Sequence, residues 1–129
     1  MLIVFFYQFF AGFLAWYNYI LIKNNRRIYH ALNGAVHIAA ALLIGIFTKW
    51  NYGVSCLLFT RVVFDTVLNL LREKGLGYIS PDPSAWTDRV EEDIILWLAG
   101  KKASERRVEW TAILFRIFIL GLATIFLFV

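Results

Sequence analysis

Long apolar runs separated by short polar segments set the pattern of this chain. Residues 2–22 carry no formal charge, and at about 1.5 Å per residue a helix of that length matches the ~30 Å hydrocarbon core of a bilayer. Further apolar runs follow at 30–48, 54–72 and 108–129. The sequence therefore predicts an all-α fold with one domain, residues 1–129, that forms an integral membrane bundle of four transmembrane helices.

The first two apolar runs each gather small and weakly polar residues on one side. Gln8, Gly12 and Ala15 share a side in the first run, and Asn33 and His37 do so in the second. Residues three and four positions apart fall on one face of a helix. Small residues let two backbones approach closely, so we expect these faces to pack against neighbouring helices.

Residues 84–99 show a different pattern, with apolar residues on one side only. Trp86, Val90, Ile94 and Trp97 align along one helical face, while acidic residues fill the early turns. The segment is too short and too acidic to span a bilayer. It is therefore predicted to be a cytoplasmic, interfacial amphipathic helix with Trp86 and Trp97 as anchors in the headgroup region.

The segments between these helices carry turn and cap signals. Residues 49–53 are predicted to form a tight outer turn, and the glycines of residues 74–77 are expected to end the third helix. Ser104 is a candidate N-cap for the last helix. The acidic run at residues 91–93 is interpreted as a solvated helix start.

Positive charge is concentrated on one side of the predicted membrane. Residues 23–27 carry three positive charges, and seven Lys and Arg lie from Arg72 to Arg107. By the positive-inside rule these segments are cytoplasmic, so both termini are predicted to lie outside. We expect the chain to lie in a bacterial inner (cytoplasmic) membrane, as a bacterial protein or a virus-encoded equivalent of one.

Composition supports a membrane protein and narrows its partners. The 129 residues are 60% hydrophobic and 17% charged, which is too apolar for a soluble domain of this size. Although the formal charge is +4, the basic residues lie beside apolar segments, so nucleic acid is not an expected partner. The predicted partners are the lipid bilayer and either a second copy of the chain or another membrane protein. Cys56 is the single cysteine, which excludes an internal disulfide.

Polar residues interrupt the third apolar run at a helical spacing. Arg61, Asp65, Asn69 and Arg72 fall within roughly 80° of one another on a helix. A charged side chain at the bilayer centre costs from about 3 to over 10 kcal/mol, so this stripe should face other helices or a wet cavity. Arg61 and Asp65 are spaced i, i+4, which predicts an intrahelical ion pair.

Counting residues from the cytoplasmic end of each helix places three more groups near this stripe. His37, Asp65 and Arg116 each lie roughly 11 Å below the cytoplasmic edge, which predicts one layer. A second layer is expected nearer the surface. The predicted polar network comprises Arg61, Asp65, Asn69, His37, Arg116, His30, Arg72 and Glu109.

Three functions fit this network. The leading hypothesis is a non-enzymatic protein that acts through helix assembly with itself or with a membrane partner, because polar residues fix which helices pair. One alternative is a metal-dependent hydrolase of lipid phosphates or headgroups. The other is a proton or cation conductor or a holin-like pore, since intramembrane Asp and His mark such paths.

No catalytic or cofactor-binding motif occurs, and no cofactor is predicted. A divalent metal is the alternative, because histidines and carboxylates are the appropriate ligand types. The candidate ligands are His30, His37, Asp65, Asp88 and Glu92.

Overall fold

The computed structural model describes residues 1–26, 30–79, 86–100 and 102–129, without the side chains of 30, 31 and 86–88. All the secondary-structure elements in this described part are helices, with no strand among them. The helices are α1 (Leu2–Lys23), α2 (His30–Phe47), α3 (Trp50–Leu71), α4 (Trp86–Ala99) and α5 (Glu105–Phe128).

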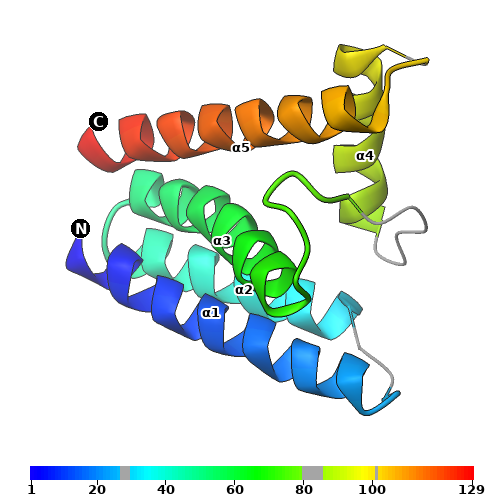
Figure 1. The fold of residues 1–129 in the computed structure, drawn as a ribbon. Coiled ribbons are helices and arrows are strands. Elements are labelled where there is room, and N and C mark those ends of the chain that lie inside the picture. The colour runs from blue at the N-terminus through cyan, green and yellow to red at the C-terminus, as the bar shows by residue number, and fades with distance from the viewer. Residues whose placement is uncertain (27–29, 80–85, 101) are drawn as a thin grey trace.

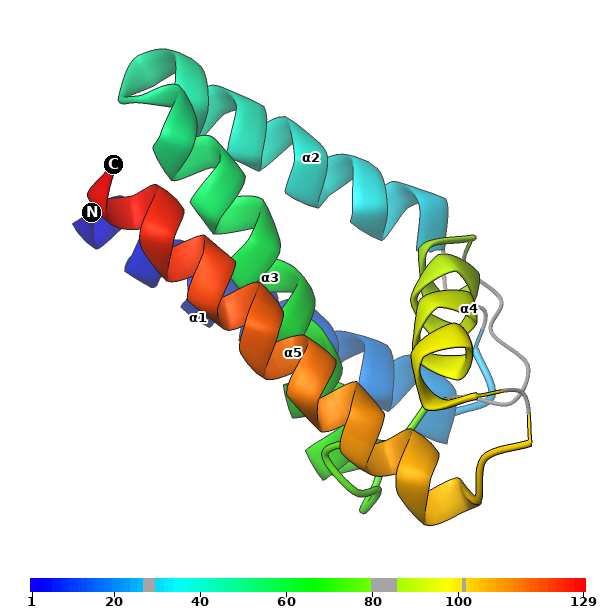
Figure 2. The ribbon, with the colours of Figure 1, turned by 90° about the horizontal axis from the view of Figure 1, so that it is seen from above.

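The four long helices run back and forth between two ends of the molecule. Figure 1 shows both termini at one end and α4 at the other, where it lies across the direction of the long helices. α3 packs against α1, α2 and α5, and Figure 2 shows it between α2 and α5. α4 packs against α5. The centre of the bundle is therefore α3, the helix that carries the polar stripe.

Three helices, α1, α3 and α5, are long and apolar enough to cross a membrane. α2 has 18 residues, and its described apolar part, Leu32–Phe47, is shorter than the other three. Large apolar side chains such as Phe9, Ile46 and Phe118 are exposed around the bundle. A helical membrane bundle accounts for this distribution, because lipid would cover those side chains.

Small residues fill the contacts between the helices. Ala11, Ala15 and Ala123 are fully buried. The backbones of α2 and α3 approach closely, since a Cβ added at Gly53 would lie 3.0 Å from the Gly45 Cα and would also clash with the Ala41 carbonyl oxygen. Only glycine fits at position 53, because backbone occupies the space that a side chain would need.

The predicted turn at residues 49–53 is wrong in extent. α3 begins at Trp50, with Lys49 as an extended N-cap residue (φ −138°, ψ 140°), so residues 50–53 form its first turn. The connection from α2 is correspondingly short, and the Thr48 hydroxyl donates to the Ile44 carbonyl at the end of α2. The packing of Gly53 on Gly45 explains the difference, since it draws this segment into the helix pair.

The end of α3 also differs from the prediction, because the left-handed residue is Glu73 (φ 56°) rather than a glycine. The Lys74 N–H donates to the Asn69 carbonyl at 2.9 Å and the Glu73 N–H to the Leu70 carbonyl at 3.0 Å, the Schellman pattern. At the start of α5 the predicted cap is confirmed, since the Ser104 hydroxyl accepts from the Arg107 N–H at 3.4 Å.

Candidate functional site: a buried charge cluster

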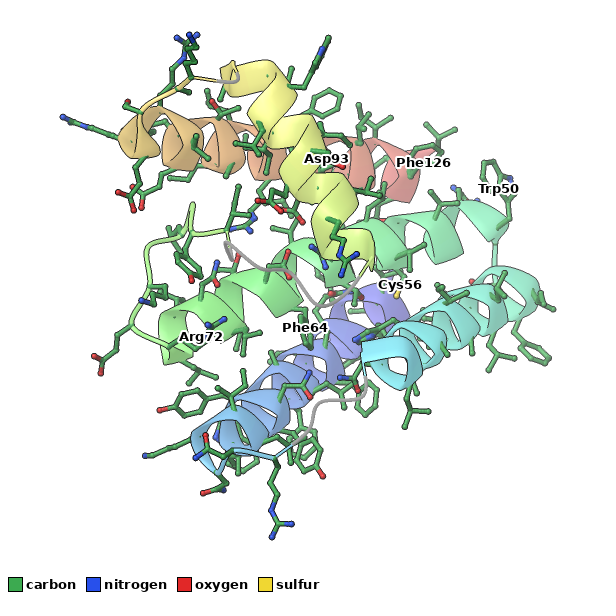
Figure 3. All side chains as sticks on the ribbon, turned by 90° about the vertical axis from the view of Figure 1, so that its right-hand side faces the viewer. Trp50, Cys56, Phe64, Arg72, Asp93 and Phe126 are labelled. Carbon is green, nitrogen blue, oxygen red and sulfur yellow. The ribbon has the colours of Figure 1, made fainter. Side chains whose placement is uncertain are left out.

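Four charged side chains from three helices meet on the side of α3 that faces α5. We refer to Arg61 and Asp65 of α3, Glu91 of α4 and Arg116 of α5 as the charge cluster. Arg61 and Arg116 lie near the middle of their helices, whereas Glu91 comes from the helix that crosses the end of the bundle. Figure 3 faces this end, with α4 crossing in front of the long helices.

Glu91 is the centre of the charge cluster. Its Oε2 accepts hydrogen bonds from Arg61, at 2.9 Å from Nε and a second from Nη2. Its Oε1 accepts from Arg116, at 3.3 Å from Nε and 3.2 Å from Nη2. Each carboxylate oxygen of Glu91 is thus held by one guanidinium, so this residue joins α3 and α5 through α4.

Asp65 is the second carboxylate of the cluster. Its Oδ2 lies 3.1 Å from the Arg61 Nη2, across one helical turn, and 3.8 Å from the Arg116 Nη2. The formal charges of these four side chains, two positive and two negative, therefore sum to zero.

Burial makes this neutrality necessary. The side chains of Glu91 and Arg116 are each 10% exposed and that of Asp65 is 14%, while Arg61 is 34% exposed. Burial alone would raise the pKa of Glu91, but the guanidiniums of Arg61 and Arg116 hold it below its ordinary value of 4.5. Glu91 is therefore ionised at neutral pH.

The segment that follows α3 closes the cluster from the side. The Arg116 Nη1 donates to the Leu76 carbonyl, and the Asn69 Nδ2 donates to the Tyr78 carbonyl at 3.1 Å. A Cβ added at Gly77 would lie 2.7 Å from the Glu109 carbonyl carbon. Figure 1 shows this segment turning back toward α5. The segment thus packs directly on α5 and supplies backbone carbonyls to buried polar side chains.

The predicted second layer gathers at Tyr78 rather than at the charge cluster. Arg72 and Lys74 stack over the Tyr78 ring, 5.6 Å and 5.2 Å from its centroid. Glu109 meets the same segment through its backbone. Within the described part of the chain, no ion pair joins Arg72 or Glu109 to the charge cluster. The side chain of His30 lies outside the described residues.

His37 lies in a different interface from the one its depth suggests. Its Nδ1 is hydrogen-bonded to the Tyr7 hydroxyl at 2.7 Å, and its ring is edge-on to Phe64 at 5.9 Å. Its Nε2 is buried without a hydrogen-bond partner. The contacts of His37 are therefore with Tyr7 of α1 and Phe64 of α3 and not with the charge cluster, because counting residues gives the height of a group but not its direction around the helix.

Uncharged hydrogen bonds join α1, α2 and α3. The Asn33 amide donates to the Asn18 Oδ1 at 3.1 Å, and the Thr60 hydroxyl donates to the Gln8 Oε1 at 3.3 Å. Together with the bond between Tyr7 and His37, we refer to these contacts as the neutral interface. A similar bond, 2.7 Å from the Ser55 hydroxyl to the Ala123 carbonyl, joins α3 to α5.

The candidate metal ligands are only partly described. Among the residues that the structure covers, no three His, Cys, Asp or Glu side chains lie together. His37 contacts Tyr7, and Asp65 contacts the two arginines. Glu92 is half-buried. The side chains of His30 and Asp88, the other two candidates, are outside the description.

α4 has two faces, and one of them contains the residue that sequence reasoning missed. Trp97 is 78% exposed, and Val90 and Ile94 are exposed beside it, as the predicted apolar stripe requires. Glu91, Ile95 and Ala99 are buried on the other face. The interpretation of the acidic run as solvated is therefore wrong for Glu91. Its spacing of four from Ile95 and eight from Ala99 is the signal that places it on the buried face.

The other predicted anchor, Trp86, has its side chain outside the described residues.

Comparison with known proteins does not assign this chain to a family. No protein-family model, no curated protein and no solved structure matches the chain.

Proposed function

We propose that this chain is an integral membrane protein with four membrane-crossing helices, in which α4 lies in the cytoplasmic surface of the bilayer. Three of those helices, α1, α3 and α5, are long enough and apolar enough to cross a membrane. The fourth, α2, is about 27 Å long at 1.5 Å per residue, and it connects the far end of α1 back to the start of α3. Both termini lie at one end of the bundle, which fits an even number of crossings.

The orientation follows from the positive charges. Lys23, Arg26, Lys74 and Lys102 belong to the segments at the end of the bundle that carries α4, whereas Lys49 belongs to the connection at the opposite end. Short cytoplasmic segments carry an excess of Lys and Arg, so the α4 end is cytoplasmic and both termini are outside. In this position the exposed Trp97, Val90 and Ile94 of α4 contact the headgroup region.

The protein acts through helix assembly, with itself or with a membrane partner, and the charge cluster is the observation that carries this proposal. Two arginines near the middle of α3 and α5 are matched by two carboxylates of the same chain. Pairing removes most of the cost of burying them and fixes α4 on the bundle. The surroundings meet a coat of large apolar side chains, so association with a second copy or a partner would rest on van der Waals packing between exposed helix faces.

Fluorescence energy transfer between differently labelled copies in vesicles tests assembly with itself, and site-specific cross-linking in native membranes tests assembly with a partner. We expect transfer that persists when the protein is diluted in lipid, or one discrete cross-linked partner. A chain that is monomeric in vesicles and forms no cross-link through any exposed helix face would contradict the proposal.

Labelling of single cysteines in a Cys56→Ser background tests the orientation in intact cells. Lys49→Cys should react with a membrane-impermeant reagent, whereas Asn24→Cys and Lys102→Cys should be protected. All three positions are exposed at the surface of the bundle, so burial does not explain a difference between them. The reverse pattern would invert the topology.

A further inference from the structure

The contact between α4 and the two arginines has the form of a ligand in a binding site. The arginines come from α3 and α5, and the carboxylate of Glu91 lies between them with one oxygen on each. Arginine guanidiniums present forked donors that match the oxygens of carboxylates and phosphates. We refer to Arg61 and Arg116 as the two-arginine site.

Both arginines are also positioned by groups other than Glu91. Asp65 lies 3.1 Å from Arg61, and the Leu76 carbonyl accepts a hydrogen bond from Arg116. The whole Arg116 residue, backbone included, is 8% exposed, and the segment that packs on α5 encloses it. The two-arginine site would therefore keep its geometry without Glu91. Without Glu91 the two guanidiniums would lose the carboxylate that accepts four of their hydrogen bonds, which favours another anion in its place.

α4 is attached to the bundle by a narrow face. Apart from Glu91, the buried residues of its described part are Ile95 and Ala99. It ends at Ala99, and the φ of 96° at the following Gly100 is readily adopted only by glycine and allows a change of direction before α5. A competitor for Arg61 and Arg116 would thus replace the ion pairs of Glu91, one of the three buried residues in the described part of α4.

We propose that the two-arginine site binds a phosphate oxyanion, that Glu91 is its resident internal ligand, and that phosphate displaces Glu91 and releases α4 from the bundle. The phosphate is either free or part of an anionic phospholipid headgroup. The lipid source rests on the proposed function, which places α4 at the level of the headgroups. The free-phosphate source does not depend on that topology.

Thermal unfolding of purified Glu91→Gln in detergent tests the site directly. Inorganic phosphate should give a saturable rise of several degrees in its Tm, with chloride at matched ionic strength as the reference. The rise should be much smaller in the wild type, where Glu91 competes, and in the control Asp93→Asn, whose substituted side chain is exposed. It should disappear in Glu91→Gln/Arg116→Gln.

Vesicles distinguish the two sources of phosphate. The same variants are reconstituted in phosphatidylcholine with and without phosphatidic acid. A rise in Tm with phosphatidic acid but not with inorganic phosphate assigns the site to the lipid headgroup, and the reverse assigns it to free phosphate. If neither probe raises the Tm of Glu91→Gln by more than it raises the Tm of the double variant, the proposal is overturned.

Should Glu91→Gln fail to fold, the wild-type protein still provides a test. Release of α4 should accelerate tryptic cleavage at Lys102, between α4 and α5, when inorganic phosphate or phosphatidic acid is added. An unchanged cleavage rate with both probes overturns the proposal. An inverted result in the cysteine labelling would overturn the proposed orientation and move α4 to the outer headgroup level. The responses to inorganic phosphate and to phosphatidic acid would still decide the two-arginine site.

Discussion

The neutral interface and the charge cluster join helices of the same bundle by opposite means. The neutral interface joins α1, α2 and α3 with single hydrogen bonds between uncharged groups, such as Asn33 to Asn18 at 3.1 Å. The charge cluster joins α3, α4 and α5 through four ionisable side chains, each within 4 Å of an oppositely charged partner. The first interface can lose one bond and leave no charge behind, whereas the second cannot.

This difference determines how each interface responds to substitution. Side-chain hydrogen bonds between membrane helices contribute about 0.6 kcal/mol on average. Removing one partner of a buried ion pair costs about 3–5 kcal/mol, because it leaves an uncompensated charge. The charge cluster should therefore be the more sensitive of the two, although both consist of contacts of similar length.

The largest effect is expected for Asp65→Asn. It leaves two guanidiniums with one carboxylate and should lower the free energy of unfolding by about 3 kcal/mol, because Arg61 is partly exposed and the loss falls at the lower end of the range. Adding Arg61→Gln restores the charge balance and should recover much of the loss. Thermal or denaturant unfolding in detergent measures both. If Asp65→Asn is as harmless as Asp93→Asn at an exposed position, the cluster is not stabilised by its neutrality.

A smaller effect is expected for Gly53→Ala, where α2 and α3 touch through backbone. The added methyl group would meet the Ala41 carbonyl and the Gly45 backbone, which should cost about 1–3 kcal/mol as overpacking. Gly121→Ala is the matched control, because a Cβ there meets no atom within 4 Å. That variant should be neutral or up to about 1 kcal/mol more stable, since alanine is the better helix former. Equal stabilities for the two variants would show that the helices separate more easily than their contact implies.

A still smaller effect is expected for Ser55→Ala. It removes the uncharged bond to the Ala123 carbonyl and should cost about 0.6 kcal/mol, with about 1.7 kcal/mol as the upper bound. Thr124→Ala, which loses a bond only to Leu120 of its own helix at an exposed position, serves as the control. A loss for Ser55→Ala equal to that of Asp65→Asn would remove the distinction between charged and uncharged contacts.

Acid should weaken the charge cluster gradually, as Glu91 gains a proton. Because the folded pKa of Glu91 lies below its ordinary value of 4.5, its contribution to stability is present above that pH. The contribution is lost as the pH falls through the lowered pKa. The difference in Tm between wild type and Glu91→Gln should therefore be constant from pH 7 to about 5 and should shrink in more acidic solution. A difference that persists in strong acid would mean that the charge of Glu91 is not what stabilises the cluster.

Much of the helical fold can be predicted from the sequence because apolar runs of membrane length leave few alternatives. The boundaries depend on tertiary packing, so they are less predictable. Gly53 belongs to α3 because it packs on Gly45, which no local signal at residues 49–53 indicates. Glu73 adopts the left-handed conformation although glycines follow shortly after it. The fourth crossing, α2, remains a proposal.

Part of the site is predictable from the sequence: Arg61 and Asp65 share a helix, and counting residues gives Arg116 the depth of Asp65, 3.8 Å away in the structure. The i, i+4 spacing is enough to predict the pair of Arg61 and Asp65, whose charged atoms lie 3.1 Å apart in the structure. Glu91 is not predictable in the same way, because an acidic run at a helix start has a simple interpretation as solvated, and the docking of α4 decides which of its carboxylates is buried. The partner of His37 is Tyr7, on a helix whose rotation about its axis cannot be obtained from residue counting.

The account depends most on the contact between Glu91 and Arg116, which joins α4 to the bundle. A double-mutant cycle of Glu91→Gln and Arg116→Gln, measured by unfolding in detergent, isolates the interaction energy of this pair. The 3.2 Å ion pair between two side chains that are each 10% exposed predicts a coupling of about 1.5 kcal/mol or more, with the double variant more stable than the sum of the single losses implies. Losses that add to within about 0.5 kcal/mol would contradict the account, because the ion pair between Glu91 and Arg116 would then contribute nothing to holding α4 on α5.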